Sequence, residues 1–312
     1  MMRIVFAGTP GFSVPYLEAF MQHPDMDVVG VVSQPDRKSG RGMKLTPSPV
    51  KKAALAANMD VLTPVTLRDN PEALAWLEQK HADFLVVVAF GMILPKTWLE
   101  MPNIAPINVH ASLLPRWRGA APIERALLAG DQETGVCVMH MDEGLDTGGI
   151  YAVKTLAITA DHTGSDLWFS LSSLGADLLM ETLPKIANGL SYQVQSDKGM
   201  TYAKKLSNDE RVIDWNMTAN SIDCVVRCFA PKPAARTLYQ GKWMKVLQGE
   251  VLANTRHADA GQILSTAEGL DVACGEGGVY RIHTLQMEGK KAMQAKDFLR
   301  GASLQQGDML GQ

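Results

Sequence analysis

The chain has 312 residues, of which 46% are hydrophobic and 20% are charged, and its formal net charge is −3. These values are typical of a folded globular protein with room for two domains, and they exclude a protein coated in basic residues. A nucleic-acid partner is not excluded, because the placement of basic residues matters more than their sum.

Neither a membrane span nor a metal site is expected. No apolar run approaches the roughly 18 residues that a span needs, and residues 1–6 lack the apolar length of a signal peptide. The cysteines, Cys137, Cys224, Cys228 and Cys274, form no CxxC pair and no Cys/His ligand spacing. We therefore expect a metal-free protein of the reducing cytoplasm.

Strand and helix signals alternate along the first half of the chain. In order, we expect a strand at residues 3–8, a helix at 14–22, a strand at 28–32, helices at 50–58 and 71–80, strands at 84–89 and 107–110, a helix at 122–129, strands at 134–141 and 149–158, and a helix at 165–187. This alternation predicts an α/β fold with a mostly parallel sheet and helices on both faces, in a domain of residues 1–189.

The composition changes after Gly189. Residues 190–208 are polar and show no apolar periodicity, so they are expected to form a linker. A helix is expected at residues 219–229, followed by short strands at 237–240, 244–252, 261–265, 270–273 and 279–285. Several short strands separated by glycine turns predict a small β-barrel over residues 209–312.

The turn Gly8-Thr9-Pro10-Gly11 follows the first strand, where a dinucleotide-binding protein would carry its phosphate loop. It lacks the GxGxxG spacing. We therefore expect no nicotinamide cofactor, although the fold is Rossmann-like, and we assign the turn to the edge of a substrate cleft.

The segment from Ile107 to Pro122 carries the strongest functional signal. Side chains alternate along a strand, so Asn108 and His110 point to the same side. A later loop supplies Asp146, with Asp142 as the rival for the same role. An Asn, a His and an Asp that meet at the end of a sheet indicate acyl-group chemistry that needs no enzyme nucleophile.

Three motifs together resemble the folate-dependent formyltransferases. They are Asn108-x-His110, Ser112-Leu113-Leu114-Pro115 followed by Arg118-Gly119, and Asp142-x-Gly144-x-Asp146-x-Gly148. The loop at residues 34–50 and the tail at 290–293 resemble those members of the family that act on initiator methionyl-tRNA. The resemblance implies a Rossmann-like formyltransferase domain and a C-terminal OB-like β-barrel that binds tRNA.

The implied reaction moves the formyl group of the co-substrate 10-formyltetrahydrofolate to the α-amino group of methionine on initiator methionyl-tRNA. The product, N-formylmethionyl-tRNA, serves translation initiation. Attack of the neutral amine forms a tetrahedral oxyanion, and each donor to such an oxyanion is worth about 3–4 kcal/mol. The resemblance implies that Asn108 and His110 are those donors, and that Asp146 orients His110 and relays a proton through water.

For the folate site, the resemblance implies three short segments. They are Ser112, Leu113, Leu114 and Pro115, then Phe90, Gly91, Met92 and Ile93, and then Asp142, Gly144 and Leu145. The alternative for the first segment is a turn that merely buries two leucines. Arg118 is left with two possible partners, the glutamate tail of folate or a phosphate of the acceptor stem.

Residues 34–49 form a long basic loop whose charge suits a phosphate backbone. The resemblance implies that this loop contacts the acceptor arm of the tRNA. The candidate contacts are Arg41 first, then Arg37 and Lys44, with Lys290 and Lys291 in the C-terminal domain. The alternative is a solvated loop without a partner.

Other functions stay open. A glycinamide ribonucleotide or sugar-nucleotide formyltransferase would share the central motifs, although the purine enzyme needs neither the basic loop nor the C-terminal domain. A formyltetrahydrofolate hydrolase would use the same three residues but has no use for a tRNA-sized surface. A catalytically inactive tRNA- or folate-binding protein is disfavoured by the intact Asn108, His110 and Asp146. We expect a monomer.

Overall fold

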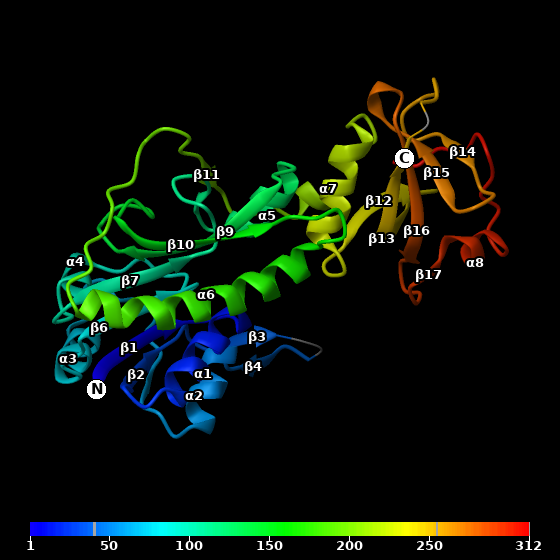
Figure 1. Ribbon diagram of the computed structural model, residues 1–312. Helices are drawn as coiled ribbons and strands as arrows, with labels where there is room; N and C mark the ends of the chain where they lie inside the picture. The colour runs from blue at the N-terminus through cyan, green and yellow to red at the C-terminus, as the bar shows by residue number, and fades with distance from the viewer. Residues whose placement is uncertain (40–41, 254, 312) are drawn as a thin grey trace. The chain divides into compact units, whose positions relative to one another are not determined.

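The computed structural model describes residues 1–39, 42–253 and 255–311, and Figure 1 labels its elements. The chain divides into two compact units. The first unit comprises Met1–Pro122, Glu133–Ala157 and Trp168–Lys204, and the second comprises Ile123–Gln132, Ile158–Leu167 and Lys205–Gln312. The sequence predicts contiguous domains, whereas the units exchange two short stretches. Contacts such as that from the Arg227 guanidinium to the His162 carbonyl, at 3.1 Å, hold these stretches in the second unit.

A seven-stranded mixed sheet forms the centre of the first unit (Figure 1). Its strands, in spatial order, are β10 (Ile150–Ala157), β9 (Glu133–His140), β7 (Ala105–His110), β6 (Phe84–Val88), β1 (Met2–Gly8), β2 (Met26–Val32) and β5 (Val61–Leu62). The five strands from β7 to β5 are parallel, and β9 is antiparallel to both of its neighbours. The predicted Rossmann-like, mostly parallel sheet is confirmed, as is the hairpin of β9 and β10.

Helices cover both faces of this sheet, as predicted, because apolar side chains project from β1 and β6 in both directions. On one face, Val5 and Leu85 pack with α3 (Pro71–Gln79) and α4 (Lys96–Leu99) in a single hydrophobic cluster. On the other face, Phe6 meets Phe20 of α1 (Val14–Gln22) edge-on, with ring centroids 6.0 Å apart. Burial of each large apolar side chain of this kind stabilises the fold by about 1.5–3 kcal/mol.

Two further helices complete the first unit. α2 (Pro49–Ala56) begins at Ser48, whose hydroxyl accepts a hydrogen bond from the Lys51 amide at 3.0 Å and so caps the helix. α6 (Gly164–Ala187), which belongs to the first unit from Trp168 onward, packs on the turn that precedes α1, where the Ser172 hydroxyl donates to the Phe12 carbonyl at 2.7 Å. The strands between these helices end at one common edge of the sheet, the edge at which open α/β sheets place their ligands.

Six strands of two or three residues were not predicted, namely β5, β17 and the two pairs described next. β3 (Arg37–Ser39) and β4 (Lys44–Thr46) form an antiparallel hairpin in the basic loop. β8 (Arg118–Gly119) and β11 (Tyr202–Ala203) form a parallel pair. The second pair lies partly in the segment expected to be a linker, so that residues up to Lys204 belong to the first unit. The predicted linker boundaries, 190 and 208, stay a prediction.

The second unit is built on an antiparallel, OB-like sheet, as predicted (Figure 1). Its strands, in spatial order, are β12 (Ala235–Tyr239), β13 (Lys242–Leu252), β16 (Val279–Met287), β15 (Leu270–Ala273) and β14 (Ile263–Ser265), with β17 (Met293–Gln294) also paired to β16. The predicted helix is α7 (Ala219–Phe229), which packs on β13 and is capped by the Thr218 hydroxyl. The short helix α8 (Ala295–Leu299) was not predicted.

A paired carboxylate in the second unit leads to a pH prediction. The Arg125 guanidinium on α5 (Pro122–Leu128) donates to both carboxylate oxygens of Glu210, and this pairing lowers the pKa of Glu210 from its ordinary 4.5. A carboxylate whose pKa is lowered by folding stabilises the fold above its unfolded pKa, and this contribution is lost as the pH falls through the lowered value.

We expect Glu210→Gln to reduce the free energy of unfolding by about 0.5–1 kcal/mol at neutral pH, because the pair is partly exposed. The variant and the wild type should converge as the pH falls from 4.5 through the lowered pKa of Glu210. Urea unfolding followed at neutral and at acid pH measures both values. An equal difference at both would show that ionisation of Glu210 contributes nothing.

Within the part of the chain that the structure describes, no helix combines the length and apolar character needed to cross a membrane.

Candidate active site

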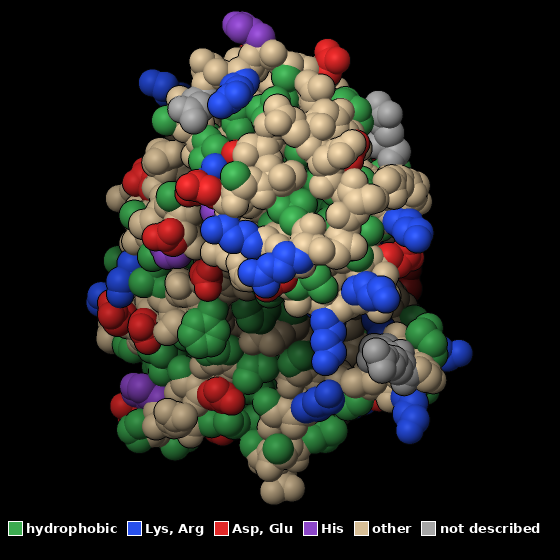
Figure 2. All heavy atoms as spheres, turned by 90° about the vertical axis from the view of Figure 1, so that its right-hand side faces the viewer, with side chains coloured by type: hydrophobic (Ala, Val, Ile, Leu, Met, Phe, Trp, Pro, Cys, Tyr) green, Lys and Arg blue, Asp and Glu red, His purple; other side chains and the backbone are tan. Residues whose placement is uncertain are grey.

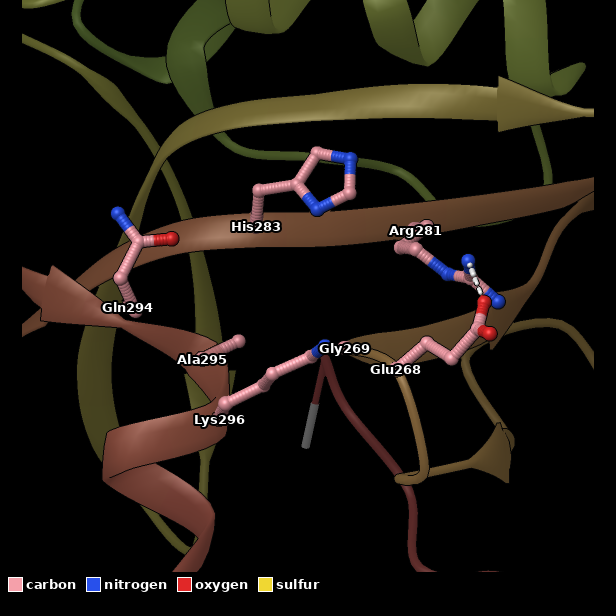
Figure 3. A pocket seen from close by; sticks show the side chains of 7 residues that line it. All are labelled: Glu268, Gly269, Arg281, His283, Gln294, Ala295 and Lys296. Carbon is pink, nitrogen blue, oxygen red and sulfur yellow. Dashed lines mark hydrogen bonds and ion pairs between the residues drawn. The ribbon is translucent and has the colours of Figure 1, made fainter.

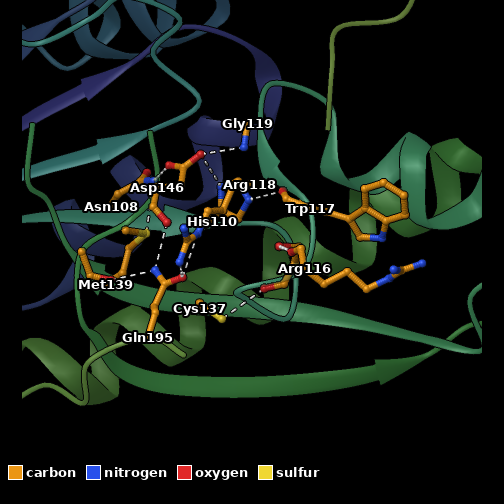
Figure 4. A network of polar contacts seen from close by, with 12 residues as sticks. Asn108, His110, Arg116, Trp117, Arg118, Gly119, Cys137, Met139, Asp146 and Gln195 are labelled. Atoms are coloured by element: carbon orange, nitrogen blue, oxygen red, sulfur yellow. Dashed lines mark hydrogen bonds and ion pairs between the residues drawn. The ribbon is translucent and has the colours of Figure 1, made fainter. Parts of the chain in front are cut away.

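Asn108 and His110 lie at the carboxyl end of β7 and point to the same face of the sheet, as their spacing predicts. The Asn108 side-chain amide donates to Oδ1 of Asp146 at 3.2 Å. His110 is 6% exposed, and its Nδ1 lies 3.6 Å from Oδ2 of the same carboxylate. Figure 4 shows the three side chains converging from two segments of the chain. The predicted residues are therefore brought together.

The carboxylate that lies against His110 is that of Asp146, whereas the Asp142 carboxylate forms its hydrogen bonds within its own loop. Oδ1 of Asp142 accepts hydrogen bonds from the Gly144 amide at 3.0 Å and from the Thr147 hydroxyl at 2.6 Å, which closes the loop on itself. Oδ2 of Asp146 accepts from the Gly119 amide at 2.8 Å. The geometry thus separates the two candidates that the sequence left as rivals.

The second ring nitrogen of His110 is also engaged. Nε2 lies 2.8 Å from the backbone carbonyl oxygen of Trp117. A carbonyl can only accept, so Nε2 carries a proton in this contact, and Nδ1 is the nitrogen that faces Asp146. The ring is consequently fixed between the Trp117 loop and the Asp146 loop.

Arg118 is buried and bonded within the protein. Its side chain is 4% exposed, and its Nε and Nη2 donate to Oε1 of Gln195 at 3.0 and 2.7 Å (Figure 4). A third nitrogen, Nη1, lies 3.0 Å from the sulfur of Met200. In this structure the guanidinium is committed to residues 195–200, and sequence reasoning missed Gln195 because a lone glutamine in a polar stretch carries no signal.

The predicted folate residues fall into buried and exposed groups. Ser112 and Leu114 are buried, and the Ser112 hydroxyl donates to the Arg116 carbonyl at 2.7 Å. The Phe90 side chain is also buried, so a contact of these three residues with a ligand would pass through the backbone. By contrast, Ile93 is 85% exposed and Leu145 is 59% exposed, and these are apolar side chains that a ring system could cover. The remaining candidates, Leu113, Pro115, Gly91, Met92, Asp142 and Gly144, lie in the same segments.

The backbone of the proposed folate segment at Phe90 and Gly91 is hydrogen-bonded to Gln34, at the start of the basic loop. The Gln34 side-chain amide donates to the carbonyls of Phe90 and Gly91, both at 2.9 Å, and accepts from the Arg37 guanidinium. Gly91 has φ +77°, and a Cβ there would meet the Gln34 amide nitrogen at 2.6 Å, so glycine is required. Arg37 and Lys44 lie on the β3–β4 hairpin, whereas Arg41 lies outside the described residues.

The basic candidates of the second unit are exposed at its surface. Lys290 and Lys291 are exposed in the turn before β17. In the view of Figure 2, exposed Lys and Arg side chains are interspersed with Asp and Glu. A surface of this kind accommodates phosphates without being uniformly basic.

A cavity of about 370 Å³ opens beside β16 in the second unit (Figure 3). Its lining includes Arg281, His283 and Lys296. The Arg281 guanidinium, however, donates to both oxygens of Asp271, at 2.6 and 2.9 Å, and to Glu268 at 2.6 Å. Asp271 raises the pKa of Arg281, with a further contribution from Glu268. This arginine is therefore a structural ion-pair partner and a poor candidate for a phosphate contact.

Comparison with known proteins places this geometry in a family. The formyl transferase model matches residues 2–183, and the formyl transferase C-terminal domain model matches residues 205–303. A methionyl-tRNA formyltransferase from Methylobacillus flagellatus is 45% identical over 312 residues, which covers 99% of this chain and 100% of the relative. The chain belongs to the methionyl-tRNA formyltransferase family. A family member from Xanthomonas euvesicatoria is 47% identical over 302 residues, covering 96% of this chain and 97% of that one.

The fold of the family is shared with solved structures of more distant sequence. An N-formyltransferase from Helicobacter canadensis, solved with folinic acid and dTDP-3-aminofucose, superposes with a TM-score of 0.68 at 19% identity. The match covers 92% of this chain and 100% of that one. The likeness extends through both units of the family fold.

Proposed function

We propose that this member of the family transfers the formyl group of 10-formyltetrahydrofolate to the α-amino group of initiator methionyl-tRNA through Asn108, His110 and Asp146. One observation carries the assignment of these residues. The Asn108 amide and the His110 imidazole each lie within 3.6 Å of the Asp146 carboxylate, at the carboxyl edge of a Rossmann-like sheet. The full-length similarity to methionyl-tRNA formyltransferases supports the choice of acceptor.

The chemistry needs no nucleophile from the protein. The amine nitrogen attacks the formyl carbon, the carbonyl π electrons move to oxygen, and the C–N10 bond then breaks as N10 takes up a proton. The Asn108 amide stabilises the oxyanion by a hydrogen bond, and the Nε2–H of His110 does the same once it leaves the Trp117 carbonyl oxygen that it contacts in this structure. The Asp146 carboxylate holds both donors and, through water, accepts the proton that the attacking amine loses.

The folate co-substrate is proposed to bind along the Phe90–Ile93 and Ser112–Pro115 segments and the Asp142–Leu145 loop. Backbone groups at Phe90, Ser112 and Leu114 and the exposed apolar side chains of Ile93 and Leu145 form its contacts. The Helicobacter canadensis enzyme was solved with a folate derivative, which supports a folate ligand for this fold. No metal or nicotinamide takes part in the proposed reaction.

The tRNA is proposed to contact the basic loop of residues 34–49 through Arg37, Arg41 and Lys44, and the second unit through Lys290 and Lys291. We propose that the enzyme acts as a monomer in the cytoplasm. The four cysteines are free and buried, as suits a reducing compartment.

The deciding experiment is formyl transfer from 10-formyltetrahydrofolate to initiator methionyl-tRNA, with elongator methionyl-tRNA and uncharged tRNA as controls. Rapid transfer to the initiator alone is expected. A protein that binds folate and formylates a small amine, but not the initiator methionyl-tRNA, would overturn the proposed acceptor. The assignment of the catalytic residues would stand in that case.

A further inference from the structure

The segment that follows α6, residues 190–204, lies against both loops that hold the proposed catalytic residues. The main chain of Gln193 exchanges hydrogen bonds with Ile150 at 2.8 and 2.9 Å, beside the Asp146 loop. On the other side, the Trp117 amide donates to the Thr201 hydroxyl and the Arg118 amide donates to the Thr201 carbonyl, both at 2.9 Å. We call this stretch the post-α6 segment. It is anchored on both sides of the pair His110 and Asp146.

Gln195 lies between these two anchors, and all of its amide contacts are directed at the site. Its Nε2 donates to the backbone carbonyl of Asp146 at 2.9 Å and to that of Gly148 at 2.7 Å. Its Oε1 accepts from Nε and Nη2 of Arg118. A single side chain therefore joins the buried guanidinium to the backbone of the loop that carries the catalytic carboxylate (Figure 4).

The orientation of this amide is fixed by its neighbours. A guanidinium has only donors and a carbonyl has only acceptors. Rotating the Gln195 amide by half a turn would place its NH2 group against Arg118 and its oxygen against two carbonyl oxygens. Each of the four hydrogen bonds thus requires a glutamine in the observed orientation.

The backbone at Asp146 needs such support. Asp146 has φ +53°, a left-handed conformation that aspartate adopts less readily than glycine. Gly148, the second carbonyl bound by Gln195, cannot be replaced without strain, since a Cβ there would lie 2.0 Å from the His140 carbonyl oxygen. The loop is therefore constrained at Asp146 and at Gly148, on either side of Thr147, and the carbonyl oxygens of both residues accept from the Gln195 amide.

We propose that Gln195 is a positioning residue for formyl transfer, which fixes the Asp146 carboxylate against His110 and Asn108 by tying its loop to Arg118. The inference rests on the catalytic roles proposed above for those three residues. Gln195 contacts none of the reacting groups itself. Its effect is transmitted through the backbone of residues 146–148.

Kinetics of Gln195→Ala give the first test. We expect kcat to fall by roughly 10–100-fold, the range seen when outer residues that orient a catalytic group are removed, with the KM values for folate and tRNA little changed. Gln193→Ala is the matched control, because that side chain is exposed and the bridge to Ile150 uses only the main chain. Wild-type kcat in Gln195→Ala, or an equal loss in both variants, would overturn the proposal.

Gln195→Glu separates positioning from simple anchoring of Arg118. A carboxylate still accepts from the guanidinium, but it cannot donate to the carbonyls of Asp146 and Gly148. We expect this variant to stay folded through its ion pair with Arg118 and to lose kcat as Gln195→Ala does. Recovery of kcat in Gln195→Glu would show that only the contact with Arg118 matters, which is contrary to the proposal.

A double-mutant cycle that combines Gln195→Ala with Asp146→Asn tests whether the effect of Gln195 on kcat passes through the Asp146 carboxylate. Once the carboxylate is absent, removal of Gln195 should cost less than a further 3-fold in kcat, because the two changes act on one group. Independent, multiplicative losses would overturn a route through Asp146. Undiminished kcat in Asp146→Asn itself would instead overturn the proposed catalytic roles, so the two failures are distinguishable.

Discussion

We expect His110→Ala to lower kcat by roughly 10²–10⁴-fold, the usual contribution of a positioned acid–base group. The imidazole supplies a donor to the oxyanion, and no other described side chain in the observed network can take its place between Trp117 and Asp146. Folate affinity should stay near the wild-type value, because His110 is not among the proposed folate contacts. Single-turnover formyl transfer, with folate binding followed by fluorescence, measures both quantities.

His110→Asn serves as the companion variant, since a side-chain amide restores a donor without restoring acid–base chemistry. It should recover part of the loss if oxyanion stabilisation is the larger effect. Wild-type turnover in His110→Ala would show that the imidazole takes no part in the mechanism. The contacts among Asn108, His110 and Asp146 would then have a structural role only.

Reversing two charges on the β3–β4 hairpin, Arg37→Glu with Lys44→Glu, should reduce kcat/KM for methionyl-tRNA by about 10²-fold at low salt. The reason is that each cation lost removes a contact with a phosphate, and each anion gained repels one. The slope of log kcat/KM against log salt concentration should become shallower by about two, one unit for each contact. Initial rates over a salt series give both numbers.

The matched control reverses two exposed lysines far along the sequence from the hairpin, Lys154→Glu and Lys185→Glu. It changes the net charge equally and should leave the salt slope as in wild type. If both double variants behaved alike, net charge and not the hairpin would control association. Arg37 also donates to Gln34, which in turn holds the Phe90 carbonyl. Folate affinity is therefore measured in parallel, to detect any change in the proposed folate segment at Phe90.

The long elements of the fold could be predicted because their sequences repeat at the period of the structure. The helix α7 and the strand β15 occupy the residues expected for them, since apolar side chains recur with helical spacing in one and make up all of the other except Asp271. The hairpin of β3 and β4 and the pair of β8 and β11 could not be predicted. Strands of two or three residues are too short to show alternation. The pair of β8 and β11 also depends on backbone groups more than 80 residues apart, as in the pairing of Arg118 with Tyr202.

The same contrast holds at the site. Asn108 and His110 could be identified because the alternation of a single strand places them together, and their motif is long enough to be specific. The choice of Asp146 over Asp142 came from the resemblance to the family. The three-dimensional loop adds the geometry, in which the Asp142 carboxylate caps its own turn and the Asp146 carboxylate reaches His110. Gln195 was beyond sequence reasoning, since its role depends on Arg118, which lies 77 positions away along the chain.

The route of the post-α6 segment determines where the enzyme can be truncated. A fragment that stops at residue 189 would retain Asn108, His110 and Asp146, but it would lack β11 and the amide of Gln195. Gly119 approaches β11 so closely that a Cβ on it would lie 2.9 Å from the Ala203 carbonyl oxygen. Removal of β11 would therefore expose the backbone of the Trp117 loop. The smallest fragment with an intact catalytic centre therefore extends to Lys204, well beyond the end of α6 at Ala187.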